Sequence, residues 1–216
     1  MKRKSKAKAK AGGYHATEIR QAAEAGVVEA QHQLALMLLT GREDLATDPA
    51  EAFRWCRTAA ENGLVRSQAL LGGLYENGVG VDQDDAQAIY WYRKAAEQGD
   101  SVAQNNLGMM LETGRGDAVR LGEAARWYRA AAEAGLAMAM TNLGILLELG
   151  RGVPASLEQA VHWYELAVKQ GEPAAAIRLG ILLLHGQGVV QDQQRAHQLL
   201  RGAAKAGDAE AQALLG

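Results

Sequence analysis

The sequence predicts an all-α solenoid of stacked helical hairpins. Alanine and leucine dominate the 216 residues, which include only three prolines and one phenylalanine, and this balance favours helix over sheet. A glycine recurs every 36 residues, at Gly72, Gly108, Gly144, Gly180 and Gly216. A large apolar residue recurs with the same period, at Trp55, Trp91, Trp127, Trp163 and Leu199. Because one helical pair is too thin to bury its own apolar faces, successive pairs must stack on one another.

Two further columns repeat with this period. One is a second glycine column, at Gly63, Gly99, Gly135, Gly171 and Gly207. The other is an alanine column, at Ala52, Ala88, Ala124, Ala160 and Ala196. The first period is one residue longer between Gly41 and Trp55 than the second is between Gly78 and Trp91, which places an insertion in a loop, where extra length costs little.

The second helix of each period, helix B, has one apolar stripe. Ala88, Trp91, Tyr92, Ala95 and Ala96 follow the i, i+3, i+4, i+7, i+8 spacing of a helix face. We expect glycines such as Gly99 to end helix B in the left-handed conformation.

Helix B also has a recognisable start. Asp48 before Pro49 and Ser156 before Gln159 are typical N-caps, whereas Arg120 breaks the column, so the third repeat is expected to begin this helix differently.

The first helix of each period, helix A, carries Ala103, Leu107, Gly108 and Leu111 in the third repeat. Gly108 has no side chain, and this suits a position where the partner helix crosses closely. A short Gly-x-Gly link then leads to helix B.

Charge is distributed unevenly along the chain. Six cations and no acid lie in the first ten residues: Lys2, Arg3, Lys4, Lys6, Lys8 and Lys10. Without them, 17 basic residues stand against 25 acidic ones, so the rest of the chain carries about −8. We expect residues 1–13 to form a flexible basic arm and 14–216 to form the solenoid. No apolar region follows the arm, so it does not match a secretory signal.

The arm admits three interpretations. A solvated tail is favoured; the others are a tether to nucleic acid, a ribosome or another anionic surface, and an arm that folds back onto the acidic body. No aromatic residue lies among the lysines to stack on bases. No apolar run reaches membrane-spanning length, and the single Cys56 fits a reducing compartment, so a cytoplasmic protein is predicted.

One repeat resembles a known family. Leu71-Gly72, Tyr75, Gly78 to Val81, Asp84, Ala88, Trp91-Tyr92, Ala95-Ala96 and Gly99 are similar to the Sel1-like repeat, a relative of the tetratricopeptide repeat. The resemblance covers residues 17–216 and implies a right-handed α/α superhelix. Its expected segments are a half repeat over 17–26, repeats over about 27–63, 64–99, 100–135, 136–171 and 172–207, and a truncated sixth helix A over 208–216.

The resemblance further implies that helix A lines a concave groove that binds a segment of a partner protein. The candidate partner-binding residues are Asn105, Asn106, Met109, Glu112, Met138, Thr141, Asn142, Ile145, Glu148, Ile177, Arg178 and Ile181. Met and Ile could be core residues of a tight superhelix or together an apolar floor, and Met adapts to irregular partners. The amides could hold a partner's backbone. The recurring Glu76, Glu112 and Glu148 predict an acidic rim that favours a basic partner.

Nothing in the sequence indicates catalysis, a metal site or a cofactor. The five histidines lack metal-ligand spacing, and Cys56 occupies the column of Tyr92, Tyr128 and Tyr164, which is typical of a small core residue rather than a nucleophile. A β-lactam hydrolase, an activity linked to some cysteine-rich relatives, remains a remote alternative, because those proteins depend on a disulfide in each repeat. The predicted function is that of a non-enzymatic adaptor or scaffold.

Overall fold

The computed structural model describes residues 16–41, 45–116, 118–205 and 207–215, which form twelve α-helices and no strand. The helices are α1 (Ala16–Glu24), α2 (Val28–Thr40), α3 (Pro49–Glu61), α4 (Val65–Asn77), α5 (Asp85–Glu97), α6 (Ser101–Thr113), α7 (Leu121–Glu133), α8 (Ala137–Leu149), α9 (Leu157–Lys169), α10 (Pro173–His185), α11 (Gln193–Lys205) and α12 (Ala209–Leu215). The even-numbered helices correspond to helix A and the odd-numbered ones to helix B. The predicted all-α solenoid is confirmed.

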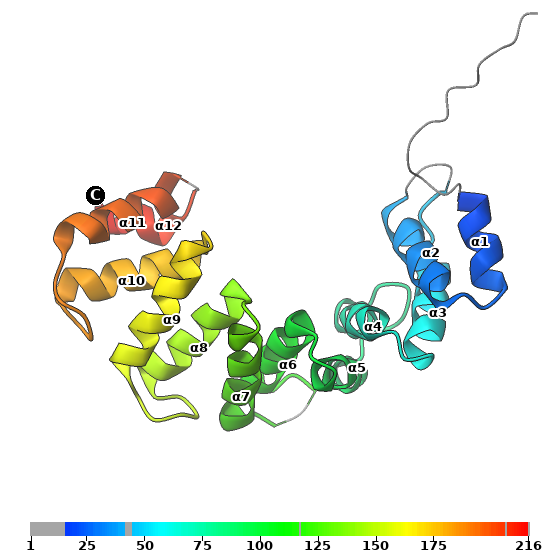
Figure 1. Cartoon of the computed structure of the whole chain (residues 1–216), viewed down its shortest axis with the longest axis horizontal. Coiled ribbons are helices and arrows are strands. Elements are labelled where there is room, and N and C mark those ends of the chain that lie inside the picture. The colour runs from blue at the N-terminus through cyan, green and yellow to red at the C-terminus, as the bar shows by residue number, and fades with distance from the viewer. Residues whose placement is uncertain (1–15, 42–44, 117, 206, 216) are drawn as a thin grey trace, which may run out of the picture.

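The hairpins stack side by side into an open arc (Figure 1). In the middle of the arc, α4, α6 and α8 lie on its inner side, and α5 and α7 lie on its outer side. In the middle of the arc, the A helices therefore form the inner wall and the B helices form the outer wall.

The starts of the B helices agree with the sequence. The Asp48 carboxylate accepts a hydrogen bond from the Glu51 backbone amide at 2.8 Å, and the Ser156 hydroxyl accepts one from the Gln159 amide at 3.3 Å. Arg120 precedes α7 without a side-chain cap, which confirms that the third repeat begins helix B differently.

The Gly-x-Gly link also brings neighbouring repeats together. Gly152 has a φ of 71°, and a Cβ placed on it would lie 2.4 Å from the carbonyl carbon of Leu121 at the start of α7. Only a glycine combines this backbone conformation with so close a contact. The link therefore packs each A–B turn onto the B helix of the preceding repeat.

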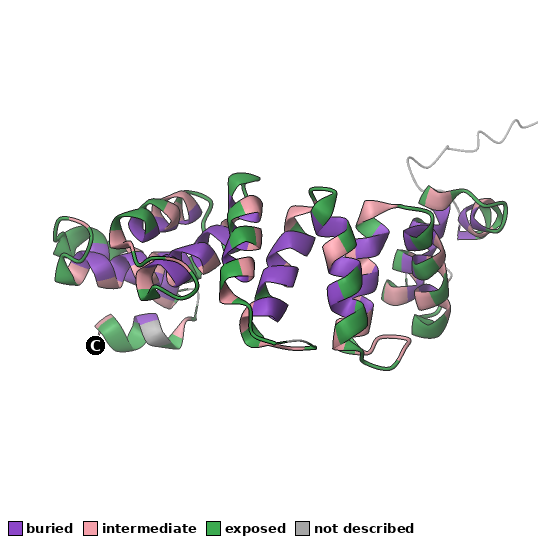
Figure 2. Cartoon of the chain, turned by 90° about the horizontal axis from the view of Figure 1, so that it is seen from below, coloured by how far each residue is buried: buried purple, intermediate pink, exposed green. Residues whose placement is uncertain are grey.

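The core follows the seams between helices along the arc (Figure 2). The leucine column is fully buried, at Leu71, Leu107, Leu143 and Leu179. Beside it, a buried glutamine side chain repeatedly joins one hairpin to the next: Gln104 Nε2 donates to the Ala96 carbonyl at 3.1 Å, and Gln68 Nε2 does the same to the Ala60 carbonyl at 3.1 Å. These carbonyls at the C-terminal end of helix B also accept the backbone amides of Gly99 and Gly63 at 3.0 Å, so the glutamine adds a second donor to each.

Among the described residues, no helix has both the length and the apolar character needed to cross a membrane.

Candidate protein-binding surface

The inner wall carries an apolar strip across two neighbouring A helices. Val102 and Met109 on α6 are 50% and 45% exposed, and Met138 on α8 is 50% exposed. Ile145, two turns further along α8 than Met138, is half-buried. We call these four residues the inner apolar strip. A group of large apolar side chains that stay exposed on neighbouring helices is typical of a binding surface.

The strip changes character toward both ends of the arc. On α10 the equivalent of Met109 and Ile145 is Ile181, which is half-buried, whereas on α4 it is Gly73. The apolar character is therefore strongest on α6 and α8.

Three of the predicted partner-binding residues are not available at the surface, which is a correction. Asn105, Thr141 and Ile177 occupy one repeat position and are only 1%, 3% and 4% exposed. Asn105 also contacts the next A helix, through Asn142 of α8. Thr141 uses its hydroxyl to donate to the Ala137 carbonyl at 3.1 Å. In the free protein, these buried side chains stabilise the packing between repeats.

The asparagines bond mainly to each other. Asn142 Nδ2 donates to Asn105 Oδ1 at 3.0 Å and so ties α8 to α6. Asn105 Nδ2 in turn donates to Asn106 Oδ1 at 3.4 Å. Asn106 and Asn142 are half-buried. Because their amides already have partners, the asparagines stabilise the inner wall before any partner arrives.

The predicted acidic rim is neutralised within the protein, which is a second correction. The Tyr128 hydroxyl donates to Glu112 Oε2 at 2.9 Å, and Arg151 Nη1 lies 3.0 Å from Glu112 Oε1. Burial and then the nearby Glu112 charge raise the pKa of Tyr128. Glu112 therefore presents little free negative charge.

The same arrangement recurs in the neighbouring repeats. Glu148 accepts from the Tyr164 hydroxyl at 2.7 Å and pairs with Arg178 at 3.5 Å. Glu76 accepts from the Tyr92 hydroxyl at 2.7 Å and pairs with Arg115 at 2.8 Å. Arg178 is thus a partner of Glu148 and not an isolated cation on the groove wall.

The predicted basic arm, with Lys2, Arg3, Lys4, Lys6, Lys8 and Lys10, lies outside the described residues.

Cys56 is a buried core residue, as its column predicted. It is 0% exposed, and burial raises its thiol pKa to about 12. Its thiol donates to the Ser67 carbonyl at 3.4 Å, and the Ser67 hydroxyl lies 2.8 Å from His32 Nδ1. A buried thiol held in its neutral form is a poor nucleophile. No group of His, Cys, Asp and Glu in the described part of the chain has the arrangement of a metal site.

Comparison with known proteins establishes the family. The Sel1 repeat profile matches residues 28–64, 65–100, 101–136, 137–172 and 173–208. The chain belongs to the Sel1 repeat family. No curated protein matches the sequence.

Solved structures of Sel1 repeat proteins agree with this assignment. A protective antigen present in uropathogenic Escherichia coli strains has a TM-score of 0.88 at 36% identity, over 93% of this chain and 43% of that one. A Sel1 repeat protein from Oxalobacter formigenes has a TM-score of 0.79 at 30% identity, over 91% of this chain and 86% of that one. An immunity protein from Pseudomonas aeruginosa shares the fold, with a TM-score of 0.53 at 20% identity, over 85% of this chain and 66% of that one. The chain spans less than half the length of the antigen.

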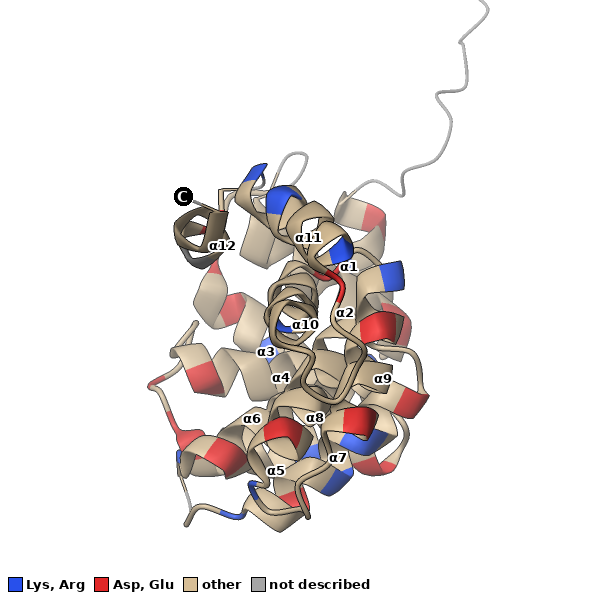
Figure 3. Ribbon diagram, turned by 90° about the vertical axis from the view of Figure 1, so that its left-hand side faces the viewer, with Lys and Arg blue, Asp and Glu red and all other residues tan. Residues whose placement is uncertain are grey.

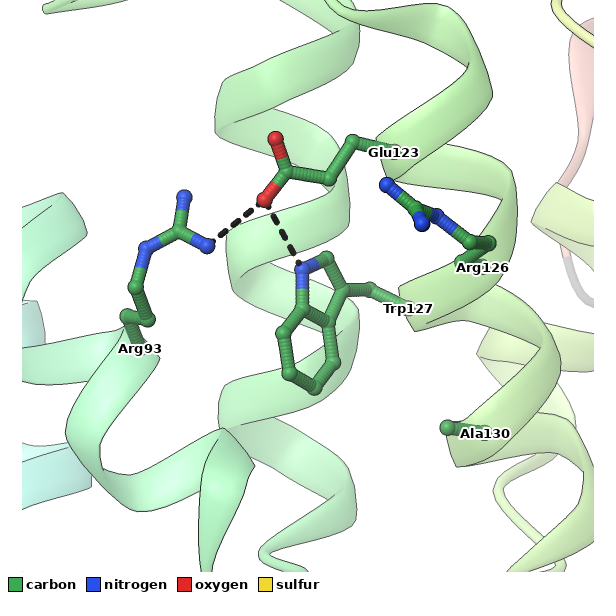
Figure 4. A pocket seen from close by; sticks show the side chains of 5 residues that line it. All are labelled: Arg93, Glu123, Arg126, Trp127 and Ala130. Carbon is green, nitrogen blue, oxygen red and sulfur yellow. Dashed lines mark hydrogen bonds and ion pairs between the residues drawn. The ribbon is translucent and has the colours of Figure 1, made fainter.

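The outer wall of this Sel1 repeat protein contains a site that the sequence analysis missed. Between α5 and α7, Arg93 Nη1 donates to Glu123 Oε1 at 2.6 Å, and Trp127 Nε1 donates to the same oxygen at 3.4 Å (Figure 4). These residues line a pocket of about 380 Å³ together with Arg126 and Ala130. The available sequence signal was an arginine on one B helix followed 30 residues later by a glutamate on the next B helix, as in Arg93 and Glu123. This pattern can be recognised only when alternate repeats are aligned.

Proposed function

We propose that this Sel1 repeat protein is an adaptor that holds a segment of a partner protein against the inner wall of the arc. The observation that carries the proposal is the inner apolar strip. Val102, Met109 and Met138 remain about half exposed although each lies on a helix that has a separate, fully buried leucine stripe. Removing such side chains from water against a partner contributes roughly 25 cal/mol per Å² of apolar area, which offsets part of the entropy cost of association.

The surroundings of the strip indicate what kind of segment it suits. Glu112 and Glu148 are held by tyrosine and arginine, and the asparagines are bonded among themselves. Few unpaired polar groups therefore lie beside the strip. A segment with an apolar face fits this wall better than the basic segment that an acidic rim would favour. Acidic and basic residues are interspersed along the helices around α5, α7 and α8 (Figure 3).

Methionine supports an adaptor role in particular. Met109 and Met138 stand on adjacent helices, and their unbranched side chains can adjust to differently shaped partners at low cost. A rigid scaffold with adaptable contacts is a physical basis for holding partner segments. The proposed role requires no catalytic group.

The test replaces Met109 and Met138 with glutamate in one double variant. Full-length wild-type and variant proteins are crosslinked in lysate of the native host, and crosslinked partner peptides are mapped by mass spectrometry. The expected result is that wild-type crosslinks to partners concentrate on α6 and α8 and are lost in the variant, because a charge buried in an apolar contact is costly.

A control variant separates this effect from general changes in charge. Val119 and Val190 are 57% and 86% exposed and lie in turns between helices. Their double glutamate variant adds the same charge away from the inner wall and should keep all partner crosslinks. Thermal unfolding followed by circular dichroism verifies that both variants are folded. Unchanged partner crosslinks in the folded Met109/Met138 variant would overturn the proposal.

A further inference from the structure

Two pockets of similar chemistry lie on B helices, one at Trp127 of α7 and one at Trp55 of α3. The Trp127 pocket is lined by Arg93, Glu123, Arg126, Trp127 and Ala130. The Trp55 pocket, of about 240 Å³, is lined by Glu51, Arg54, Trp55 and Thr58. The two tryptophans are two repeats apart, so the same sequence positions build both pockets.

The carboxylate in each pocket is already neutralised. The Glu123 carboxylate accepts hydrogen bonds from Arg93 at 2.6 Å, from Arg120 at 3.3 Å and from the Trp127 indole N–H at 3.4 Å. Burial pushes the pKa of Glu123 upward, but the hydrogen bonds from Arg93 and Trp127 outweigh it, and the net pKa is lowered. This carboxylate stays ionised, and its charge is already shared between two arginines.

The Trp55 pocket repeats this pattern. Glu51 is bonded by both guanidinium nitrogens of Arg20, and it accepts the Trp55 indole N–H at 3.1 Å. The hydrogen bond from Arg20 is the main cause of its lowered pKa.

One arginine in each pocket is left over. The side chains of Arg126 and Arg54 are exposed, and neither side chain makes a hydrogen bond or an ion pair with the described part of the chain, although the Arg54 charge helps to lower the pKa of Glu51. Arg126 and Trp127 project from neighbouring positions of α7, and Ala130 lies one turn further along the same helix (Figure 4). Each pocket thus combines an apolar ring with one unpaired positive charge, in a protein whose body is acidic by about −8 without its first ten residues.

The seam at Trp91, between these two pockets, keeps the tryptophan but differs at three neighbouring positions. Tyr90 replaces the unpaired arginine, Gln87 replaces the glutamate, and Lys94 lies over the rings of Tyr90 and Trp91 at 5.0 and 5.4 Å from their centroids. The ring faces there are covered by the protein's own cation. The unpaired arginine beside a partly open indole is therefore specific to the Trp55 and Trp127 seams.

We propose that the outer wall binds acidic segments of a partner protein, with a carboxylate at Arg126 or Arg54 and a neighbouring apolar residue on the adjacent tryptophan. Charge complementarity favours this occupant, because the carboxylates within each pocket are satisfied and the only unpaired charge that lines it is positive. Arginine and tryptophan are also the residues that most often dominate binding energy at protein interfaces. This surface is separate from the inner apolar strip and does not depend on its function.

The charge balance disfavours a nucleic acid as the occupant. Binding of a phosphate backbone usually requires a row of cations along the strand. Here each pocket offers a single arginine without an ion pair in the described part of the chain.

The test starts with a phage-displayed library of random linear peptides, selected on the full chain and on the Arg54→Ala/Arg126→Ala double variant. Peptides enriched on the wild-type protein should contain Asp or Glu next to an aromatic or aliphatic residue, and they should fail to bind the double variant. Arg201→Ala is the matched control, because Arg201 is an exposed arginine of a B helix outside both pockets. It should leave enrichment unchanged.

The best enriched peptide is then synthesised with a fluorescent label, and its affinity is measured by anisotropy. The double variant should weaken binding about tenfold or more, whereas Arg201→Ala and Met109→Glu/Met138→Glu should leave it unaltered. Trp127→Leu should also weaken binding, and more so when combined with Arg54→Ala.

Three outcomes would overturn the proposal. The selected peptides could lack acidic residues, they could bind the double variant as tightly as the wild type, or a labelled poly(U) strand could bind in a manner that depends on Arg54 and Arg126 while the peptides do not. Because the inner-strip variant is measured in the same assay, failure here is distinguishable from failure of the adaptor proposal.

Discussion

Gly144 lies directly against the ring of Tyr164, so that a Cβ on Gly144 would stand 2.4 Å from the Cε1 of that ring. Gly72 with Tyr92 and Gly108 with Tyr128 repeat this contact. In the first repeat both members change together, because Ala35 stands in place of the glycine and Cys56 in place of the tyrosine. Helix A and helix B can therefore approach closely only when one residue of the pair is small.

This contact predicts that Gly144→Ala changes the free energy of unfolding in opposite directions in the wild-type protein and in a Tyr164→Cys background. In the wild-type protein the substitution should destabilise the fold by about 1–3 kcal/mol, because the new methyl group collides with the Tyr164 ring. In a Tyr164→Cys background the collision is absent, and the same substitution should stabilise the fold by about 0.5–1 kcal/mol through helix propensity. Urea unfolding of the four proteins of this cycle measures both effects.

Gly73 supplies the control. It lies next to Gly72 on α4, and a Cβ placed on it would come no closer than 3.4 Å to another residue, the Tyr92 hydroxyl. Gly73→Ala should be neutral or stabilising with tyrosine present. Equal losses for Gly73→Ala and Gly144→Ala would show that the ring contact is not the cause.

The buried Gln104 predicts a stabilising substitution. Its Oε1 is buried and has no partner among the described residues, whereas the equivalent Oε1 of Gln68 accepts from Gln98 Nε2 at 2.7 Å. Ala134 occupies the position of Gln98 in the next repeat. Ala134→Gln should therefore provide the missing donor and raise the free energy of unfolding by about 1 kcal/mol.

The chain itself indicates the control for Ala134→Gln. In the first repeat the position holds Asn62, which bonds to the Thr58 carbonyl instead, and Gln31 Oε1 remains without a described partner. Ala134→Asn should therefore give no gain. A gain of equal size with asparagine, measured by thermal unfolding, would contradict the proposed hydrogen bond.

His32 predicts a loss of stability in acid. It is buried between α2 and α4, and burial lowers its pKa below the ordinary value of 6.5. As pH falls through 6.5, the unfolded chain takes up a proton that the folded protein does not, so stability present above 6.5 decreases until the folded pKa is reached. The midpoint temperature of thermal unfolding should decrease as the pH is lowered from about 8 to about 5.

Other groups also titrate in this range, so the comparison is with His32→Asn. Asparagine occurs at the equivalent position as Asn105 and cannot take up a proton in this range. The pH-dependence of unfolding should be shallower in the variant. Identical slopes for the two proteins would place the titrating group elsewhere.

Removal of the Glu112 carboxylate should lower the free energy of unfolding mainly through the loss of one hydrogen bond. Glu112→Leu removes the acceptor of the Tyr128 hydroxyl, which should lower the free energy of unfolding by about 1 kcal/mol. The ion pair with Arg151 adds little, because the Arg151 side chain is 44% exposed. Glu112→Gln keeps a carbonyl acceptor and should lose less, whereas Glu158→Gln on the exposed surface of α9 should have no effect. Urea unfolding in low and high salt separates the two contributions, since only the ion pair is screened.

Much of the fold could be predicted because it depends on local, repeated signals. The 36-residue spacing of Gly72, Gly108 and Gly144, the cap at Asp48 and the apolar stripe around Trp91 each act within one hairpin or between adjacent hairpins. The candidate site was less accessible, because exposure depends on how closely neighbouring helices pack. Asn105 and Met109 are both on α6, yet the structure buries the first and leaves the second about half exposed.

The sequence by itself determined the repeat, the two helices within it and the stacking into a solenoid, since apolar faces at fixed spacing leave no other way to be buried. Only the tertiary structure decided which charges are free. Glu112 is a lone acid along the chain, but the fold brings Tyr128 and Arg151 to it. Arg126 resembles its neighbours in sequence, but the seam pairs Glu123 with Arg93 and leaves Arg126 without an ion pair in the described structure. Electrostatic partners are set by distances between segments far apart in the chain, and those distances exist only after the hairpins have stacked.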